Sequence, residues 1–329
     1  MSVRVGVVGC GTIARRVHIP GLQAAGAELT AFTSRTRASA EETARECGGG
    51  TVLDTWSELV VRPDVDLVDI CTPNALHAEI AVAAAEAGKH VLVEKPMALT
   101  VAEADRMIAA ARAGGVALVP AQNSRFLAPF VAMREAVARA DVGEVRAFRC
   151  AWGHGGPEGW AAGAKWFRQR EASGGGALID LGVHAADLLR SVLGDEPMQV
   201  AAMTSPGATG DVEDLAQLVV RFARGAIGTL QASWAVADGN DNQLTIQGTH
   251  GTLHLDHRAL PLLSTGQGAP TRLTMPDPCP TLFELVIAAL SAGTALPITA
   301  EDGRAAVALV EAAYRSSASG RVEPVDGAA

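Results

Sequence analysis

Residues 3–14 read VRVGVVGCGTIA, and this stretch decides the fold of the first part of the chain. An apolar run, Val3 to Val8, precedes a glycine-rich segment, Gly9 to Ala14, and a helix-like pattern that starts at Thr12. In a strand–turn–helix unit the first glycine permits a tight turn, the second lets the backbone approach a pyrophosphate, and a small third residue lets helix and strand pack closely. The helix N-terminus then offers unpaired N–H donors to the phosphates. The stretch predicts a dinucleotide-binding turn, although the same string in another context would also suit a glycine turn that binds nothing.

Strand and helix patterns alternate through the first third of the chain, which predicts an α/β fold with a doubly wound parallel sheet. The expected strands are Val3–Val8, Leu29–Thr33, Leu67–Cys71, His90–Glu94 and Val116–Val119. Two alanine-rich segments, Asn74–Ala87 and Thr100–Ala113, begin at small polar residues and end at glycines, as helices do. The alternation stops after Pro120, so we expect a dinucleotide-binding domain over residues 1–121.

Residues 122–329 are expected to form an α+β domain built on a large, mainly antiparallel open sheet. Apolar runs separated by Gly, Asn and Asp are typical of antiparallel strands. These runs are Gln199–Met203, Leu215–Phe222, Ile227–Ala235, Gln243–Gln247 and Thr252–Asp256. Helices are expected over Leu127–Ala140 and Val183–Leu193.

Composition limits the classes of partner. Lys and Arg number 27 against 36 Asp and Glu, a formal charge of −9 that opposes binding to nucleic acid or to an anionic membrane. The sequence has no run of eighteen apolar residues and no secretory leader pattern. Its five scattered cysteines lack CxxC spacing, which is typical of reduced thiols. We therefore expect a cytoplasmic protein without nucleic-acid or membrane partners.

Three histidines near one another, His250, His254 and His257, do not predict a metal site. Thr252–Asp256 is an expected strand, on which His254 and His257 would face opposite sides. No cysteine or acidic residue is spaced to complete a tetrahedral set, so we expect no metal.

Lys95 follows an expected strand in the segment GKHVLVEKP, residues 88–96. Ligands of doubly wound sheets bind at the carboxyl ends of the strands, and this position favours a functional lysine over an ordinary Glu94–Lys95 charge pair. A lysine beside a substrate hydroxyl can donate a hydrogen bond to it and stabilise its alkoxide.

Asp180 and His184 lie four residues apart in the segment DLGVH. A helix that starts here would place both on one face, where they can meet one substrate. The imidazole can then take or return a hydroxyl proton while the carboxylate orients it. The alternative is an N-cap aspartate with a core histidine, but the upstream run Gly174–Gly176, which permits close approach of a ligand, favours function.

Two further features concern a substrate. Trp160 and Trp166 stand in a glycine-rich stretch and suit a sugar-binding cleft and a core equally well. Acidic residues concentrate in the expected loops of the second domain, which favours a cationic amino-sugar, although a solvated acidic rim has the same pattern. These residues are Glu158, Asp211, Glu213, Asp214, Asp238 and Asp241.

With these residues in hand, the chain resembles the glucose-fructose oxidoreductase, inositol dehydrogenase and MocA (Gfo/Idh/MocA) family over nearly its whole length. The matching segments are GCGTIA at 9–14, TPNALH at 72–77, AGKHVLVEKP at 87–96, RF at 125–126, GGGALIDLGVHAADLL at 174–189 and IQGTHGTLHLD at 246–256. The resemblance implies an N-terminal Rossmann domain followed by a substrate-binding domain whose open sheet forms homodimers or homotetramers. It also implies an oxidoreductase that moves a hydride between a nicotinamide and a sugar or cyclitol carbon.

The resemblance implies roles for individual residues. Lys95, Asp180 and His184 inherit the catalytic group, with His184 removing the hydroxyl proton and Lys95 stabilising the alkoxide. The expected cofactor contacts are Gly9, Gly11, Thr12, Ile13, Ser34, Arg35, Arg37, Pro73, Asn74, His77, Glu94 and Lys95. The expected substrate contacts are Lys95, Arg125, Trp166, Asp180 and His184. For His77, capping or packing of its own helix remains an alternative.

The sequence departs from the usual dinucleotide pattern after the second strand. The acidic residue that binds the ribose 2′-hydroxyl is absent, and Ser34-Arg35-Thr36-Arg37 stands there instead. Serine and arginine can hold a 2′-phosphate, which favours NADP(H) over NAD(H), whereas Arg35 stacked on adenine would suit both cofactors.

The substrate is expected to be a sugar, a cyclitol or a sugar-bearing natural product such as an amino-sugar or aminoglycoside. One alternative keeps the nucleotide but uses transient oxidation to cleave a glycoside, as an NAD-dependent glycosidase. Another is a non-catalytic, dinucleotide-sensing regulator, which would have no need of Lys95, Asp180 and His184 together.

Overall fold

The computed structural model describes residues 2–161, 163–237, 240–256, 260–266 and 268–327, which fold as two compact units. Unit 1 comprises Met1–Gln122 and Pro280–Arg304, and unit 2 comprises Asn123–Cys279 and Ala305–Ala329. The first boundary lies beside the expected one at residue 121. The return of Pro280–Arg304 to unit 1 differs from the expected continuous domain over 122–329.

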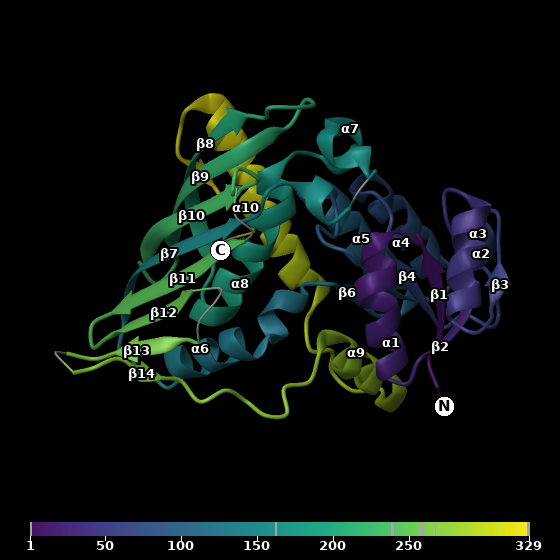
Figure 1. The fold of residues 1–329 in the computed structure, drawn as a ribbon, viewed down its shortest axis with the longest axis horizontal. Coiled ribbons are helices and arrows are strands. Elements are labelled where there is room, and N and C mark those ends of the chain that lie inside the picture. The colour runs from purple at the N-terminus through teal and green to yellow at the C-terminus, as the bar shows by residue number, and fades with distance from the viewer. Residues whose placement is uncertain (1, 162, 238–239, 257–259, 267, 328–329) are drawn as a thin grey trace. The chain divides into compact units, whose positions relative to one another are not determined.

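Unit 1 is a six-stranded parallel sheet with the order β3-β2-β1-β4-β5-β6, so the strand order reverses between β1 and β4 (Figure 1). Its strands are β1 Arg4–Val8, β2 Glu28–Thr33, β3 Thr51–Val52, β4 Leu67–Ile70, β5 His90–Val93 and β6 Leu118–Pro120. Its helices include α1 Ile19–Ala24, α2 Arg37–Glu46, α3 Trp56–Val60, α4 His77–Glu86, α5 Val101–Gly114 and α9 Leu282–Ala292. The predicted doubly wound sheet is confirmed; β3 was not expected, because two residues are too few to show a pattern.

The glycine-rich turn after β1 begins as predicted, but the helix behind it does not. Gly9 has φ +97°, and a Cβ there would lie 2.6 Å from the carbonyl oxygen of Cys71, so the turn requires glycine. The following helix opens with a π-helical turn, Ala14–His18 (η1), before α1. Residue periodicity predicted an ordinary helix here, and a single wide turn leaves no mark in that periodicity.

The segment 280–304 joins unit 1 through apolar contacts. Phe283, on α9, sets its ring edge against His18 with 5.1 Å between ring centroids, and it fills the space beside Gly21. Gly303 is packed so closely that a Cβ would lie 2.6 Å from the Met97 sulfur. The apolar face of α9 thus has its partner in the N-terminal part of the chain, a pairing that sequence order does not reveal.

Unit 2 contains a nine-stranded sheet with the order β14-β13-β12-β11-β7-β10-β9-β8-β15. All its strand pairs are antiparallel except β7 with β10, which run parallel, so the α+β prediction is confirmed. The strands are β7 Val145–Gly153, β8 Pro197–Pro206, β9 Glu213–Phe222, β10 Ile227–Ser233, β11 Asp241–Gly248, β12 Thr252–Asp256, β13 Leu262–Ser264, β14 Thr271–Arg272 and β15 Glu323–Pro324. The longer helices are α6 Ala128–Ala138 and α8 Val183–Leu193, together with α10 Ala300–Ser319, which begins in unit 1 and belongs to unit 2 from Ala305.

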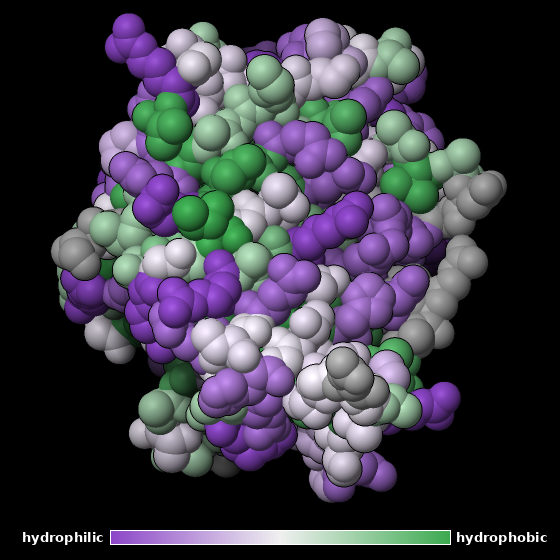
Figure 2. All heavy atoms as spheres, turned by 90° about the vertical axis from the view of Figure 1, so that its left-hand side faces the viewer, coloured by the Kyte–Doolittle hydropathy of each residue, from purple (hydrophilic) through white to green (hydrophobic). Residues whose placement is uncertain are grey.

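One face of this sheet packs on helices and the other is open. Along β9 the residues alternate between buried and exposed, with Leu218 and Val220 buried and Val219 exposed between them. Figure 2 looks onto the open side and shows apolar side chains in separate patches among polar ones. Met203, Val219 and Ile227 are exposed apolar residues of β8, β9 and β10.

Within the described ranges, every helix is too short or too polar to traverse a lipid bilayer.

Candidate active site

In unit 1 the expected cofactor residues gather at one edge of the sheet. Because neighbouring strands run parallel, the segments that leave β1, β2, β4 and β5 all emerge at the carboxyl-terminal edge. These segments contain Gly9–Ile13, Ser34–Arg35, Pro73–His77 and Glu94–Lys95 respectively. The strand order reverses between β1 and β4, which is where doubly wound sheets bind their ligands.

The second glycine of the turn suits a ligand and not the chain's own packing. Gly11 is exposed, and a Cβ placed there would have no described atom within 4 Å. An alanine side chain at position 11 would therefore collide with no other described residue, in contrast to position 9. An open glycine at a helix start is what a closely bound pyrophosphate requires.

Two buried side chains at the same edge lack partners. Gln122, which follows β6, is 1% exposed, and neither its Nε2 nor its Oε1 has a hydrogen-bond partner among the described residues. The Thr72 Oγ1, after β4, is likewise buried and unpartnered. Buried polar groups are normally hydrogen-bonded, so both fit a polar ligand at this edge. Sequence reasoning missed Gln122, although its position directly after a short apolar strand is the signal that singled out Lys95.

The loop after β2 leaves one arginine available for a ligand. The Ser34 Oγ accepts a hydrogen bond from the backbone N–H of Cys10 at 3.3 Å, which joins this loop to the glycine turn. Arg37 pairs with Glu41 at 2.9 Å and with Asp54 at 2.6 Å. Arg35 is exposed and forms no ion pair within the described part of the chain. Of the two expected phosphate-binding arginines, Arg35 is therefore the better placed.

Lys95 stands in a loop whose backbone is held from two sides. Its N–H donates to the Oε2 of the buried Glu94 at 2.9 Å. The Pro96 carbonyl lies 2.8 Å from the His77 Nδ1, and the His77 Nε2 lies 3.0 Å from the Thr72 carbonyl. Burial lowers the pKa of His77, so the neutral ring donates a single hydrogen bond, which we assign to the shorter contact. His77 therefore links the loops after β4 and β5, and its contact with the cofactor stays a prediction.

In unit 2, Asp180 and His184 lie on one continuous helical segment that opens with a π-helical turn, Leu178–Gly182 (η6), and continues as α8. The sequence predicted an ordinary helix start. The wide turn changes the angle between Asp180 and His184, and such turns recur at functional sites.

Asp180 is buried and His184 half-buried, and the two are held differently. The Asp180 Oδ2 accepts the indole N–H of Trp234 at 3.0 Å and lies 3.5 Å from the His154 Nε2. The His184 Nδ1 lies 3.5 Å from the Ser124 Oγ, and its ring faces Trp152 with 6.2 Å between centroids and 23° between planes. A fixed carboxylate and a partly exposed imidazole one turn apart can bind a hydroxyl and move its proton.

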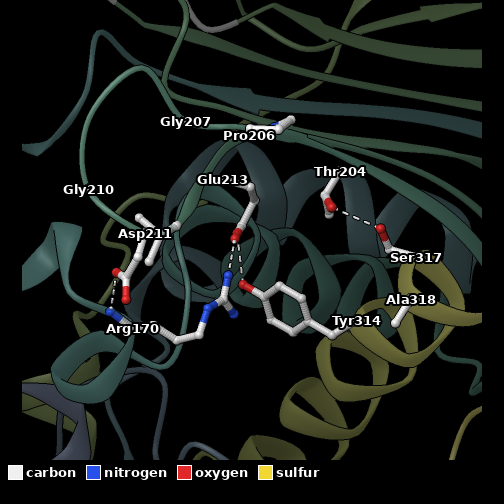
Figure 3. Close-up of a pocket in the computed structure, with 11 residues that line it drawn as sticks. Arg170, Thr204, Pro206, Gly207, Gly210, Asp211, Glu213, Tyr314, Ser317 and Ala318 are labelled. Carbon is white, nitrogen blue, oxygen red and sulfur yellow. Dashed lines mark hydrogen bonds and ion pairs between the residues drawn. The ribbon is translucent and has the colours of Figure 1, made fainter.

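The helix start is anchored by Glu213, whose contacts with Tyr314 and Arg170 are drawn in Figure 3. The Glu213 Oε1 accepts the backbone N–H groups of Gly176 and Leu178 at 2.9 and 3.0 Å and the Tyr314 hydroxyl at 2.8 Å. A buried carboxylate at this end of the helix also suits the helix dipole. Burial raises the pKa of Tyr314, as does the facing Glu213 carboxylate, so the hydroxyl stays protonated and donates.

The Gly174–Gly176 run serves this anchor, which corrects its interpretation as room for a ligand. A Cβ at Gly175 would collide with the Tyr314 hydroxyl, and one at Gly176 with the backbone of Glu213. A cavity of about 660 Å³ lies beside Glu213, lined also by Arg170 and Tyr314, but neither Asp180 nor His184 lines it.

Two expected substrate residues have partners inside unit 2. Arg125 is buried and forms a two-pronged ion pair with Asp187, with its Nε 2.9 Å from the carboxylate. Trp166 stacks on Phe167 at 3.8 Å and 23° and is half-buried. A substrate role for either residue stays a prediction.

The acidic loop residues are mostly paired, which weakens the charge argument for a cationic substrate. Arg168 pairs with Asp214 and with Glu158, at 2.9 Å for the latter. The Asp211 carboxylate accepts the backbone N–H of Arg170 at 2.8 Å, and Glu213 is buried in its anchor. Asp241 accepts from Gln243, and Asp238 lies outside the described residues.

Among the described residues one side-chain group has metal-ligand types close together. Atoms of His18, Asp69 and Cys71 lie within 4.8 Å of one another. Both ring nitrogens of His18, however, face carboxylate oxygens at 2.7 Å, a hydrogen-bond distance. We therefore interpret the group as a hydrogen-bond network. His257, one of the three histidines weighed as metal ligands, lies outside the described residues.

Comparison with known proteins identifies the family. The model of the oxidoreductase family with an NAD-binding Rossmann fold matches residues 3–122, and that of the GFO/IDH/MocA C-terminal domain matches residues 130–254. The chain belongs to the GFO/IDH/MocA family. By family it is an NAD(P)-dependent oxidoreductase that acts on CH–OH groups.

Several relatives are similar over most of their length. The chain is 36% identical over 255 residues to 1,5-anhydro-D-fructose reductase from Ensifer adhaerens, covering 76% of this chain and 74% of that one. It is 34% identical over 306 residues to a putative UDP-kanosamine synthase oxidoreductase subunit from Amycolatopsis mediterranei, covering 84% of each. Among solved structures, GenD2 from gentamicin A biosynthesis in complex with NAD is 32% identical, with a TM-score of 0.86 and coverage of 99% of this chain and 97% of that one. Levoglucosan dehydrogenase in complex with NADH and levoglucosan is 25% identical, with a TM-score of 0.89 and coverage of 99% and 100%.

Proposed function

We propose that this protein transfers a hydride between a nicotinamide and a ring hydroxyl or ketone of a sugar or cyclitol, with a sugar-bearing natural product as the favoured substrate. The observation that carries the proposal is the pair on the helix of unit 2: a buried Asp180 held by Trp234 and a half-buried His184 one turn later. The dinucleotide would supply the hydride acceptor or donor at its nicotinamide ring.

Lys95, Asp180 and His184 would act on one substrate. In the oxidation direction His184 takes the hydroxyl proton on a ring nitrogen, and Lys95 donates a hydrogen bond to the oxygen as negative charge develops there. Asp180, fixed by Trp234, holds a neighbouring hydroxyl or orients the imidazole. Reduction reverses the proton transfer.

The residues of unit 1 fit the dinucleotide. The glycine turn with Gly11 would face the pyrophosphate, and Asn74, Thr72 and Gln122 would offer hydrogen bonds to the nicotinamide half. Arg35 and Ser34 would bind a 2′-phosphate, which favours NADP(H). Calorimetric dissociation constants for NADP⁺ and NAD⁺, with wild type and Arg35→Ala, test this preference. A selective loss of NADP⁺ affinity supports it, and equal losses for both cofactors show that Arg35 stacks on adenine, which would suit NAD as well.

An amino-sugar substrate rests on relatives and not on charge. The similar structure of GenD2 comes from gentamicin A biosynthesis, and a similar sequence is named a putative UDP-kanosamine synthase subunit. The similarity to levoglucosan dehydrogenase and to 1,5-anhydro-D-fructose reductase favours a neutral sugar as the substrate instead. A panel of polyols, neutral sugars and amino-sugars, followed at the NAD(P)H absorbance band, separates the two classes.

The catalytic proposal is tested with Lys95→Ala and a matched lysine control. Lys89→Met is the control, because Lys89 precedes β5 and its Nζ donates to the carbonyls of Arg62 and Val65 at the amino-terminal side of that strand. We expect Lys95→Ala to lose about 3 kcal/mol or more of transition-state stabilisation while dinucleotide binding stays nearly intact, because the phosphate contacts remain. A wild-type rate in Lys95→Ala contradicts the mechanism.

The same assays separate the other two functions. Release of sugar without net cofactor reduction identifies a glycosidase. Tight dinucleotide binding without turnover on any substrate of the panel identifies a regulator.

We also propose that the open sheet of unit 2 joins copies of this chain as a homodimer or homotetramer. Exposed apolar residues on that face, Met203 and Val219 among them, favour such an interface (Figure 2). Light scattering of wild type and Val219→Lys tests it, and an unchanged mass would place the interface elsewhere. A cytoplasmic location fits the five unpaired cysteines.

A further inference from the structure

Beneath the loop that carries Lys95, unit 1 contains a buried charged network centred on His18. His18 is 1% exposed and belongs to the π-helical turn η1. Its Nδ1 lies 2.7 Å from the Asp69 Oδ1 of β4, and its Nε2 lies 2.7 Å from the Glu94 Oε1 after β5. One side chain thus joins two neighbouring strands at their carboxyl ends.

The geometry requires a protonated ring. Carboxylates only accept hydrogen bonds, so two such contacts need a donor on each ring nitrogen. Burial lowers the pKa of His18, but the facing Asp69 carboxylate and the neighbouring Cys71 outweigh it and hold this pKa well above 6.5. The groups that face the ring are Asp69, Cys71, Glu94 and, from α9, the apolar edge of Phe283.

Glu94 connects His18 to the backbone of Lys95. With its Oε1 held by His18, the carboxylate has a fixed plane, and its Oε2 accepts the backbone N–H of Lys95 at 2.9 Å. Nothing in the sequence singled out His18, because a lone histidine in a helix start is usually a packing residue.

We propose that His18 is a positioning residue, which acts through Glu94 to set the backbone of Lys95 and so the direction of its ammonium group. The inference rests on the role of Lys95 proposed above. In this role His18 supports catalysis without any contact with the substrate.

Three variants test the proposal. His18→Gln keeps a polar side chain of similar size, but both N–H donors of the amide sit on one nitrogen, whereas the carboxylates face two different ring nitrogens of His18. Glu94→Gln is the conservative rescue, because its amide oxygen can accept from Lys95 while its NH₂ donates to a neutral His18. Leu22→Ala, on the adjoining α1 and fully buried, is the control for destabilisation alone.

We expect His18→Gln to lower kcat by about tenfold or more, with the dinucleotide dissociation constant within about threefold of wild type. Leu22→Ala should keep kcat within about twofold at a temperature below all melting points, and the kcat of Glu94→Gln should fall between those of Leu22→Ala and His18→Gln. The alkaline limb of the kcat/KM profile should move up in His18→Gln, which removes a cation near Lys95. In Glu94→Gln the anion and the His18 cation disappear together, so the limb should move less than in His18→Gln. Loss of stability alone would move neither limb.

A second readout does not depend on activity. Because the folded-state pKa of His18 is raised above its ordinary value, its contribution to stability is complete below about pH 6.5 and is lost as pH rises through the folded pKa. The melting-temperature difference between wild type and His18→Gln should therefore be largest near neutrality or below and should shrink in alkali.

The outcomes separate this inference from the proposed function. A wild-type rate in Lys95→Ala overturns the function itself. Suppose that Lys95→Ala loses activity but His18→Gln keeps both its kcat and the limbs of its pH profile. This result overturns only the role of His18. A melting difference that does not depend on pH also overturns it, because the ring would then be neutral.

Discussion

Breaking the buried pair between Arg125 and Asp187 should destabilise unit 2 far more than removing the pair altogether. The two side chains are 8% and 1% exposed, and Arg125 donates to both carboxylate oxygens. In Arg125→Met the Asp187 carboxylate stays buried and loses these donors, at a cost of about 3–5 kcal/mol. For a unit of this size, 1 kcal/mol corresponds to roughly 2–4 °C, so melting should fall by roughly 6–20 °C.

The double variant Arg125→Met with Asp187→Leu supplies the control. It replaces both charges with apolar groups of similar volume, and a buried pair replaced in this way is often neutral or stabilised. Differential scanning calorimetry of wild type, Arg125→Met, Asp187→Leu and the double variant completes a double-mutant cycle for the pair. A melting point for Arg125→Met within about 2 °C of wild type would refute the reasoning. Because the double variant should be folded, its KM also tests the expected substrate contact of Arg125, and an unchanged KM removes that role.

The remaining predictions concern the turn and the catalytic helix. Gly9→Ala should destabilise by about 2 kcal/mol or more, because its φ is +97° and its Cβ would lie 2.6 Å from the Cys71 oxygen. Gly11→Ala should leave the melting temperature unchanged and weaken dinucleotide binding by about tenfold or more. Calorimetry in which Gly11→Ala lowers the melting temperature more than Gly9→Ala contradicts the roles given to both glycines. His184→Asn should lower the rate by about two to four orders of magnitude and remove the acidic limb of the pH profile, and a retained limb would show that another group titrates. Trp234→Phe should cost about 1.5–3 kcal/mol, since the buried Asp180 loses its indole donor, and a melting curve like that of wild type would count against that bond.

Sequence alone determined the features that depend on local order. The parallel sheet of unit 1, the turn at Gly9 and the limits of α8 follow from apolar periodicity and glycine placement, which act over a few residues. The family also follows, because AGKHVLVEKP and the DLGVH segment are contiguous strings. These signals identify Lys95, Asp180 and His184 as candidates without any knowledge of what surrounds them.

Tertiary structure decided what depends on partners far apart in the chain. Phe283 returns a C-terminal segment to unit 1, a pairing with Gly21 and His18 that no local pattern encodes. The sequence suggested that the Gly174–Gly176 run leaves space for a ligand, but Glu213 and Tyr314 occupy the space beside Gly175 and Gly176. The charge available to a substrate also depends on tertiary contacts, because Arg168 pairs with Glu158 and Asp214, which the sequence left as free acidic residues. The network of His18 needs residues from three segments. Folding brings a carboxylate to each ring nitrogen, and this favours the protonated ring although burial opposes it.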